Sequence, residues 1–288
     1  MLKIYTQLRY IVFLFSCGLF WQGCNVINPH EQTPTYIHID SFNFLPNPSV
    51  LNVSLSHNIT CVWVYYNNQN VGVFDLPATF PVMATGTGTL EMFPGIAVGG
   101  LNDILAVYPF YEPDTFTFTA QPGKIINHKA STRYYSAAKV HMISDFNFGT
   151  NFKLDGGNIP IIVDTNSADV FEGSGSGLIN LTIPGVDSSI DSITIGPIPA
   201  SSAFIEFNYK NTIPFYVGMQ SNLTSGISSA PYYLTGIYPS DHWQKFYLNV
   251  QDFAAQYPGS TYNLYIKASL TSGTSGRVLL DNVQLITH

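Results

Sequence analysis

The chain ends in "GRVLLDNVQLITH", residues 276–288, and this run predicts the closing strand of a β-sandwich. Alternate residues of a strand point to opposite faces. The first face would carry Val278, Leu280, Asn282, Gln284 and Ile286, and the second Leu279, Asp281, Val283 and Leu285. The second set predicts a core-facing row with a carboxylate in its middle. Because a buried charge is costly unless it is paired, hydrogen-bonded or metal-bound, Asp281 needs partners from another segment.

Four earlier runs of similar composition precede this strand, at residues 169–183, 203–219, 242–253 and 262–270. They are rich in Val, Ile, Tyr, Phe and Thr and are separated by clusters of Asn, Gly, Pro and Ser. Only 10% of the residues are charged, whereas 14% are aromatic. This pattern predicts an all-β protein.

The first half of the chain predicts a second, smaller sandwich over residues 35–122. Two strands, at 59–66 and 71–75, flank the turn "NNQN", and Asn tolerates the left-handed backbone of such turns. The composition changes over "AQPGKIINHKASTRYY" (120–135), so we expect a linker at 123–134 and a C-terminal domain at 135–288.

The N-terminus has the pattern of an export signal. Lys3 and Arg9 precede the apolar run "YIVFLFSCGLFW" (10–21), which is short for a transmembrane helix. "QGC" at 22–24 resembles a bacterial lipobox, which implies a signal peptide at 1–23 and acylation of Cys24; "LFSC" makes Cys17 the alternative. The third interpretation of this segment is an ordinary secretory signal whose cysteines are incidental. Residues 24–34 would form a tether, with two prolines.

The charge is acidic and unevenly distributed. Without the first 23 residues the chain holds 9 Lys and Arg and 18 Asp and Glu, and no Lys or Arg lies between Cys24 and Gly123. Nucleic-acid binding needs a basic surface, so it is excluded as a function class.

Two resemblances to known families follow from these patterns. "VWVYYNNQNVG" (62–72) resembles a hairpin of the small PEGA and carboxypeptidase-regulatory sandwiches, which are accessory modules. "HWQKFYLNVQDF" (242–253) and "RVLLDNVQLI" (277–286) resemble carbohydrate-binding modules and related galactose-binding-like jelly rolls, in the version found on envelope lipoproteins of Bacteroidota. This resemblance implies an all-β chain with two sandwiches, the second a jelly roll, and it implies a buried Trp243.

The second resemblance also implies candidate sites. Many such jelly rolls hold a structural calcium ion with a Glu near the first strands and an Asp in the last strand. Glu172 and Asp281 stand at those places, with Asp169 as a third acid, although Gly173 replaces an acid that usually follows the Glu. The competing interpretation is that Asp281 only accepts hydrogen bonds or pairs with a basic side chain.

Glycan binding needs aromatic rings that stack on sugars, together with a few polar groups. The candidates are Tyr134, Tyr135, Tyr216, Tyr232, Tyr233 and Tyr238, and the polar stretch 225–243 favours Tyr232, Tyr233 and Tyr238 as the ligand-binding set. Against this, aromatic residues also occupy strands for packing alone.

No catalytic motif stands out: G-x-S-x-G, H-E-x-x-H and C-x-x-C do not occur. The sequence therefore predicts a non-catalytic, lipid-anchored outer-membrane protein that binds a glycan or a protein partner. The alternatives are a structural or assembly subunit of an outer-membrane complex and, less favoured, an accessory protein of carbohydrate-active enzymes. Whether it faces the periplasm or the cell exterior stays open.

Overall fold

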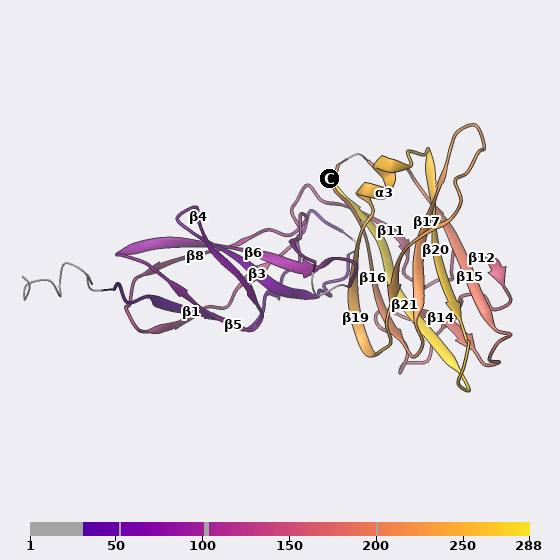
Figure 1. The fold of residues 1–288 in the computed structure, drawn as a ribbon, viewed down its shortest axis with the longest axis horizontal. Helices are drawn as coiled ribbons and strands as arrows, with labels where there is room; N and C mark the ends of the chain where they lie inside the picture. The colour runs from indigo at the N-terminus through magenta and orange to yellow at the C-terminus, as the bar shows by residue number, and fades with distance from the viewer. Residues whose placement is uncertain (1–30, 52, 101–103, 200) are drawn as a thin grey trace, which may run out of the picture.

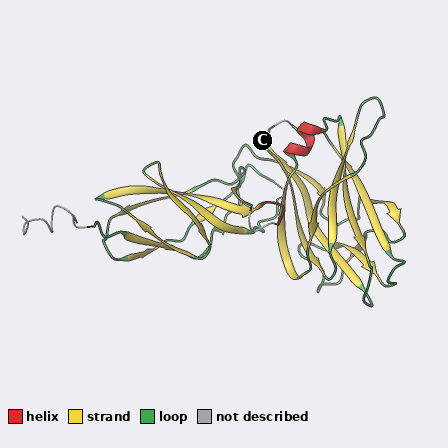
Figure 2. Cartoon of the chain, viewed as in Figure 1, coloured by secondary structure: helices red, strands yellow, loops and turns green. Residues whose placement is uncertain are grey.

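The computed structural model describes residues 31–51, 53–100, 104–199 and 201–288. These residues form two β-sheet bodies arranged along the long axis of the molecule (Figure 1), with little helix (Figure 2). The helical segments described are α3 (Gln251–Gln256) and the short 3-10 turn η2 (Val98–Gly100). None of the described helices is long and apolar enough to cross a membrane. The prediction of an all-β chain is confirmed.

The N-terminal sandwich packs a three-stranded sheet, in the order β5-β1-β9, against a larger sheet in the order β4-β3-β6-β7, with β8 also paired to β6. Val62, Val64, Leu90 and Met92 fill its core because they alternate along β3 and β6. The bounds are β1 (Thr35–Ile39), β2 (Asn43–Phe44), β3 (Ile59–Tyr66), β4 (Gln69–Asp75), β5 (Ala78–Val82), β6 (Thr87–Ala97), β7 (Leu105–Val107), β8 (Asp114–Thr119), β9 (Ile125–Asn127) and β10 (Ser131–Thr132).

The asparagine turn forms where the sequence predicts it. Asn67 and Asn68 join β3 to β4 with φ angles of 47° and 66°. The stretch 123–134, which we expected to be a linker, instead contributes two short strands: β9 pairs with β1 and β10 pairs with β2, both in parallel. Residues 123–134 therefore extend the N-terminal sandwich.

The C-terminal sandwich has two sheets. The strand order is β13-β14-β21-β16-β19 in the first, with β11 also paired to β21, and β12-β15-β20-β17-β18 in the second. The bounds are β11 (Lys139–Ser144), β12 (Lys153–Gly157), β13 (Ile162–Asp164), β14 (Ser176–Leu181), β15 (Ser188–Ile195), β16 (Ala203–Asn211), β17 (Phe215–Asn222), β18 (Tyr232–Ile237), β19 (Ser240–Asn249), β20 (Thr261–Ser269) and β21 (Gly276–Thr287).

The last strand does not alternate as its sequence predicts. Asn282 has a φ of 48°, and the register of β21 against β16 shifts by one residue at this point. This β-bulge exchanges the two faces of the strand. Val278 and Leu280 therefore face the core together with Val283 and Leu285, whereas Asp281 lies on the opposite face, where it is also fully buried. The prediction that Asp281 shares a face with Val283 and Leu285 is wrong.

The two sandwiches meet through a buried aromatic cluster. The sheet that contains β16 and β19 lies toward the N-terminal sandwich, and the sheet that contains β15 and β20 lies on the far side (Figure 1). The cluster includes Phe44, Tyr108, Phe110, Tyr111 and Tyr134 from the first body and Phe204, Tyr247 and Ile286 from the second. Tyr134, a candidate for glycan stacking, is therefore an interior residue of this junction.

A buried carboxylate lies in this junction. Glu206 on β16 accepts hydrogen bonds from the hydroxyls of Tyr108 and Tyr134 (2.7 Å for Tyr134). Nε2 of Gln284 donates to it at 2.9 Å, and Nζ of Lys245 lies 2.7 Å away. The side chains of Glu206 and Lys245 are both fully buried. Because buried charges are tolerated only with such partners, the junction favours one fixed arrangement of the two sandwiches.

Candidate functional site

The outer face of the sheet β12-β15-β20-β17-β18 carries tyrosines among polar side chains. Phe215, Val217 and Met219 of β17 point into the core, so Tyr216, Gly218 and Gln220 point outward. The same alternation on β20 turns Asn263, Tyr265 and Lys267 outward. We call this surface the tyrosine face; it comprises Tyr216, Tyr233 and Tyr265 together with Asp155, Ser192, Thr194, Gln220, Asn263 and Lys267.

Two glycines make room for the outermost tyrosine rings. Gly218 pairs with Tyr233, and a Cβ atom at Gly218 would lie 2.8 Å from the Tyr233 ring. Gly236 pairs with Tyr216, and a Cβ atom there would lie 3.0 Å from the Tyr216 ring. Both rings therefore lie close over the strand backbone. Their centroids are 6.4 Å apart in an edge-to-face arrangement, and 48% of the Tyr216 surface is exposed.

Hydrogen bonds fix the polar part of the tyrosine face. Oε1 of Gln220 accepts from the Tyr265 hydroxyl at 2.9 Å and from Nδ2 of Asn263 at 3.1 Å. Oδ1 of Asn263 accepts from the hydroxyl of Thr194 at 2.9 Å. These bonds span three adjacent strands, so their donors and acceptors are held in place before any ligand arrives.

The charges on this face are mixed. The ammonium of Lys267 lies 5.1 Å from the centroid of the Tyr233 ring. Burial, followed by the nearby Asp155 carboxylate, raises the pKa of Tyr233 above its usual value. Burial also raises the pKa of Tyr265. Both phenols are consequently protonated, and able to donate hydrogen bonds, throughout the physiological pH range.

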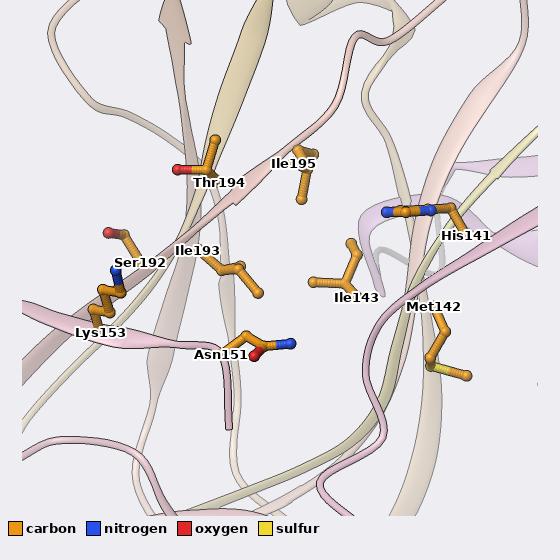
Figure 3. Close-up of a pocket in the computed structure, with 9 residues that line it drawn as sticks. All are labelled: His141, Met142, Ile143, Asn151, Lys153, Ser192, Ile193, Thr194 and Ile195. Atoms are coloured by element: carbon orange, nitrogen blue, oxygen red, sulfur yellow. The ribbon is translucent and has the colours of Figure 1, made fainter. Parts of the chain in front are cut away.

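A pocket of about 540 Å³ adjoins the tyrosine face at its β12–β15 end (Figure 3). It opens between β11 and β15. Ile143 and Ile193 approach one another across it, and Ser192 and Lys153 lie on the side opposite His141 and Met142. The lining residues are His141, Met142, Ile143, Asn151, Lys153, Ser192, Ile193, Thr194 and Ile195. The pocket shares Ser192 and Thr194 with the tyrosine face, whereas Ile143, Ile193 and Ile195 belong to the core between the sheets.

The three predicted tyrosines separate in the structure. Tyr233 belongs to the tyrosine face. Tyr232, the preceding residue, points to the other side of β18, where its ring stacks toward Phe253 at a centroid distance of 6.4 Å. Tyr238 lies between β18 and β19 and is 81% exposed.

The structure places two of the three predicted calcium ligands near each other. Glu172 accepts a hydrogen bond from Nδ2 of Asn282 (2.9 Å), and the backbone N–H of Glu172 donates to Asp281 (3.2 Å). Asp169 is instead bound to Arg277 at 2.8 Å. Among the described residues, no three His, Cys, Asp or Glu side chains form a group that could hold a metal ion. Calcium at this place stays a prediction.

The other predicted residues are also accounted for. Cys24 and its alternative Cys17 lie outside the described residues. Trp243, expected in the core, is only partly buried and lies near the junction of the two sandwiches, with its ring centroid 5.2 Å from that of Phe171. The residues of β19 that do face the core include Phe246 and Leu248.

Sequence reasoning missed Tyr265, Gln220, Asn263 and Lys267 as site residues. The signal was present, because "FYVGMQ" (215–220) and "YNLYIKA" (262–268) both alternate apolar residues with tyrosine or polar residues. The sheet order, which brings the two runs together, was not visible in the sequence.

Comparisons with known proteins concern the fold. Neither a protein-family model nor a curated protein matches the sequence. Among solved structures, the chain is similar to the family 11 carbohydrate-binding module of the cellulosomal cellulase Lic26A-Cel5E of Clostridium thermocellum, with 13% identity, a TM-score of 0.38, and coverage of 52% of this chain and 95% of that chain.

A family 29 carbohydrate-binding module complexed with cellulohexaose is also similar, with 14% identity, a TM-score of 0.36, and coverage of 52% of this chain and 92% of that chain. A third structure concerns the promiscuous specificity of carbohydrate-binding modules of the β-sandwich superfamily; identity is 14%, the TM-score is 0.38, and coverage is 89% of this chain and 99% of that chain. At these values the likeness is to the β-sandwich fold alone.

Proposed function

We propose that this chain is a non-catalytic envelope protein that binds a glycan on the tyrosine face. The observation that carries the proposal is the pair Tyr216 and Tyr233, whose rings lie over glycines beside hydrogen-bonded Gln220 and Asn263. Exposed aromatic rings offer a surface for the apolar face of a sugar, and the fixed amides offer partners for its hydroxyls. The C-terminal sandwich has one sheet with the order β14-β21-β16-β19 and a second with the order β15-β20-β17-β18. These two antiparallel sheets support the predicted jelly roll.

Binding of glycans by the purified protein, on a glycan array followed by calorimetry, tests the proposal. Tyr216→Ala combined with Tyr233→Ala should weaken binding of the selected glycan by about a hundredfold, since each lost stacking contact is worth on the order of 1–1.5 kcal/mol. The melting temperature should change little, because the substitutions lie on an outer face.

Tyr232→Ala is the matched control, because Tyr232 is the neighbouring tyrosine and is 56% exposed on the other side of the same strand. It should leave glycan affinity unchanged. Equal binding by the double variant and the wild-type protein would show that the tyrosine face is not the site.

The proposal includes membrane anchoring through Cys24, which the lipobox-like sequence supports. Two or more acyl chains hold a protein stably on a bilayer. Cys24→Ser should therefore move the protein from the membrane fraction to the soluble fraction, whereas Cys17→Ser should not. Retention of the Cys24→Ser protein in membranes would rule out this anchor.

A structural or assembly role is the second candidate, and the buried junction favours it because a fixed two-body shape suits a scaffold. Here the N-terminal sandwich would act as a spacer, as its resemblance to accessory modules implies. If no glycan binds and stable outer-membrane partners co-purify with the protein, this second function replaces the first.

A further inference from the structure

A hollow of about 390 Å³ lies on the N-terminal sandwich, the body that the glycan proposal does not use. Its volume is within the range of ligand pockets in proteins. The walls come from β3, β6, β7 and the turn between β3 and β4. The lining residues are Tyr65, Asn68, Glu91, Phe93 and Val107. We call this site the Glu91 hollow.

Strand alternation turns the side chains of the Glu91 hollow away from the core. Val64 of β3 and Met92 of β6 belong to the core of the N-terminal sandwich. Their neighbours Tyr65, Glu91 and Phe93 therefore point to the outer face of the sheet. All three residues are partly exposed, and the oxygens of Glu91 are not among the buried polar atoms. A molecule from outside the chain can consequently reach both the rings and the carboxylate.

Two aromatic rings meet at nearly a right angle in the hollow. The ring centroids of Tyr65 and Phe93 are 5.6 Å apart, and their planes are inclined by 82°. The faces of aromatic rings carry partial negative charge and attract cations. The two rings therefore favour a group that is both apolar enough to pack on them and positively charged.

The carboxylate in the hollow has no counter-charge of its own. Glu91 lies directly opposite Tyr65 on the neighbouring strand. Within the part of the chain that the structure describes, it makes neither a hydrogen bond nor an ion pair. The strands of its sheet, β3, β4, β6, β7 and β8, contain no Lys, Arg or His. Because a partly buried charge is favourable only with a partner, the hollow calls for a cation that another molecule supplies.

The composition of the hollow selects among cations. A single carboxylate offers too few oxygen ligands for calcium, which takes six to eight. An ammonium is a compact, strongly hydrated charge, whereas a guanidinium is planar and more weakly hydrated. A guanidinium can stack on an aromatic ring and also donate two N–H groups to one carboxylate. Tyr65 and Glu91 together therefore fit an arginine side chain best.

An apolar strip continues from the hollow across the same face of the sheet. Trp63 pairs with Val73 of β4 on one side and with Phe93 of β6 on the other. Trp63 is partly exposed, and Val73 is 39% exposed. A free small cation would leave this strip uncovered, whereas the residues beside an arginine in a polypeptide would pack on it.

We propose that the Glu91 hollow binds an arginine side chain of a protein partner, with apolar residues beside that arginine packed on Trp63 and Val73. The hollow and the tyrosine face lie on different sandwiches (Figure 1). The proposal therefore does not depend on glycan binding. In this arrangement the N-terminal sandwich holds a protein, and the C-terminal sandwich is left free for a glycan.

Titration of the purified, ¹⁵N-labelled protein with capped tripeptides, followed by NMR, tests this site. The peptide Val-Arg-Val should shift the backbone amide signals of residues 63–65 and 91–93. Val-citrulline-Val, which has nearly the same shape without the charge, should not. Gly-Arg-Gly should bind more weakly than Val-Arg-Val, because it lacks the apolar neighbours. Glu91→Gln and, separately, Tyr65→Leu should each weaken binding of Val-Arg-Val by about tenfold.

Asp75→Asn is the matched control, because it removes the same charge from an exposed position on the same sheet but outside the hollow. It should leave the affinity for Val-Arg-Val nearly unchanged, and all three variants should bind the glycan as the wild type does. Equal binding of the arginine and citrulline peptides, or wild-type affinity of Glu91→Gln, would overturn the proposal. Equal affinity for the two arginine peptides, or tighter binding of choline chloride, would also overturn it, since the hollow would then take a free cation.

Discussion

Asp281 is held inside the protein by hydrogen bonds from three directions. Its carboxylate accepts from the hydroxyl of Ser176 (2.6 Å) and from the backbone N–H groups of Glu172 (3.2 Å) and Asn282 (2.7 Å). Burial nevertheless dominates and raises its pKa to about 6 from a usual 3.8. The carboxylate thus joins the last strand to the 171–176 loop, which makes it a structural clamp.

This pKa predicts how stability should depend on pH. Between about pH 4 and pH 6 the native state holds a proton on Asp281 and the unfolded state does not, so the free energy of unfolding falls as the pH rises through this window. The loss amounts to about 3 kcal/mol for a shift of this size. Asp281→Asn cannot titrate, so the stability difference between wild type and variant should shrink by about that amount from pH 4 to pH 7, as measured by urea denaturation.

A constant difference across this range would contradict the raised pKa. A thermal melt of the wild-type protein with and without a chelator tests the calcium prediction. The competing interpretation, in which Asp281 only accepts hydrogen bonds, requires no change in melting temperature, and the Asp169–Arg277 pair and the three donors to Asp281 favour it. A fall on chelation would instead show that calcium ties Glu172 to Asp281.

At the scale of the element, the bulge in β21 decides which residues face the core. Strict alternation placed Asp281 beside Val283 and Leu285, and a single inserted residue reversed that. The sequence of apolar residues does not reveal a bulge of this kind, because both faces of this strand are rich in apolar residues. By contrast, β17 and β20 alternate without interruption between their core and outer faces, so the outward position of Tyr216 and Tyr265 could be predicted.

Two substitutions at the bulge separate its backbone requirement from its hydrogen bond. Asn282→Gly and Asn282→Val both lose the bond from Nδ2 to Glu172. Glycine accepts the φ of 48°, whereas a β-branched residue does not. We expect Asn282→Gly to destabilise the protein by about 1 kcal/mol and Asn282→Val by about 2–3 kcal/mol in urea denaturation. Equal losses would mean that the strand can shift its register without cost.

At the scale of the whole molecule, the two sandwiches behave as one body because their junction is a core. Three separate parts of the sequence bring tyrosines there: Tyr108 with Tyr111, then Tyr134, and then Tyr247. Sequence reasoning predicted the all-β fold but not this junction, since a tyrosine that will be buried between two sheet bodies has the same local pattern as one that binds a ligand.

The buried pair in the junction predicts cooperative unfolding. In calorimetry, the wild-type chain should show one transition, because separating the sandwiches would expose Glu206 and the aromatic cluster. Glu206→Ala leaves Lys245 buried without a counter-charge, at a cost of about 3–5 kcal/mol. We expect its transition to split in two, with the N-terminal sandwich melting separately. One unsplit transition at the wild-type temperature would contradict this coupling.

The buried junction fixes the position of the tyrosine face relative to the N-terminal sandwich. This face lies on the side of the C-terminal sandwich opposite the junction, and β1 lies at the other end of the molecule (Figure 1). The N-terminal sandwich therefore separates the start of β1 from the tyrosine face by its whole length. A partner that contacts the tyrosine face can therefore be bound far from any structure that holds the start of the chain, with the N-terminal sandwich as the spacer between them.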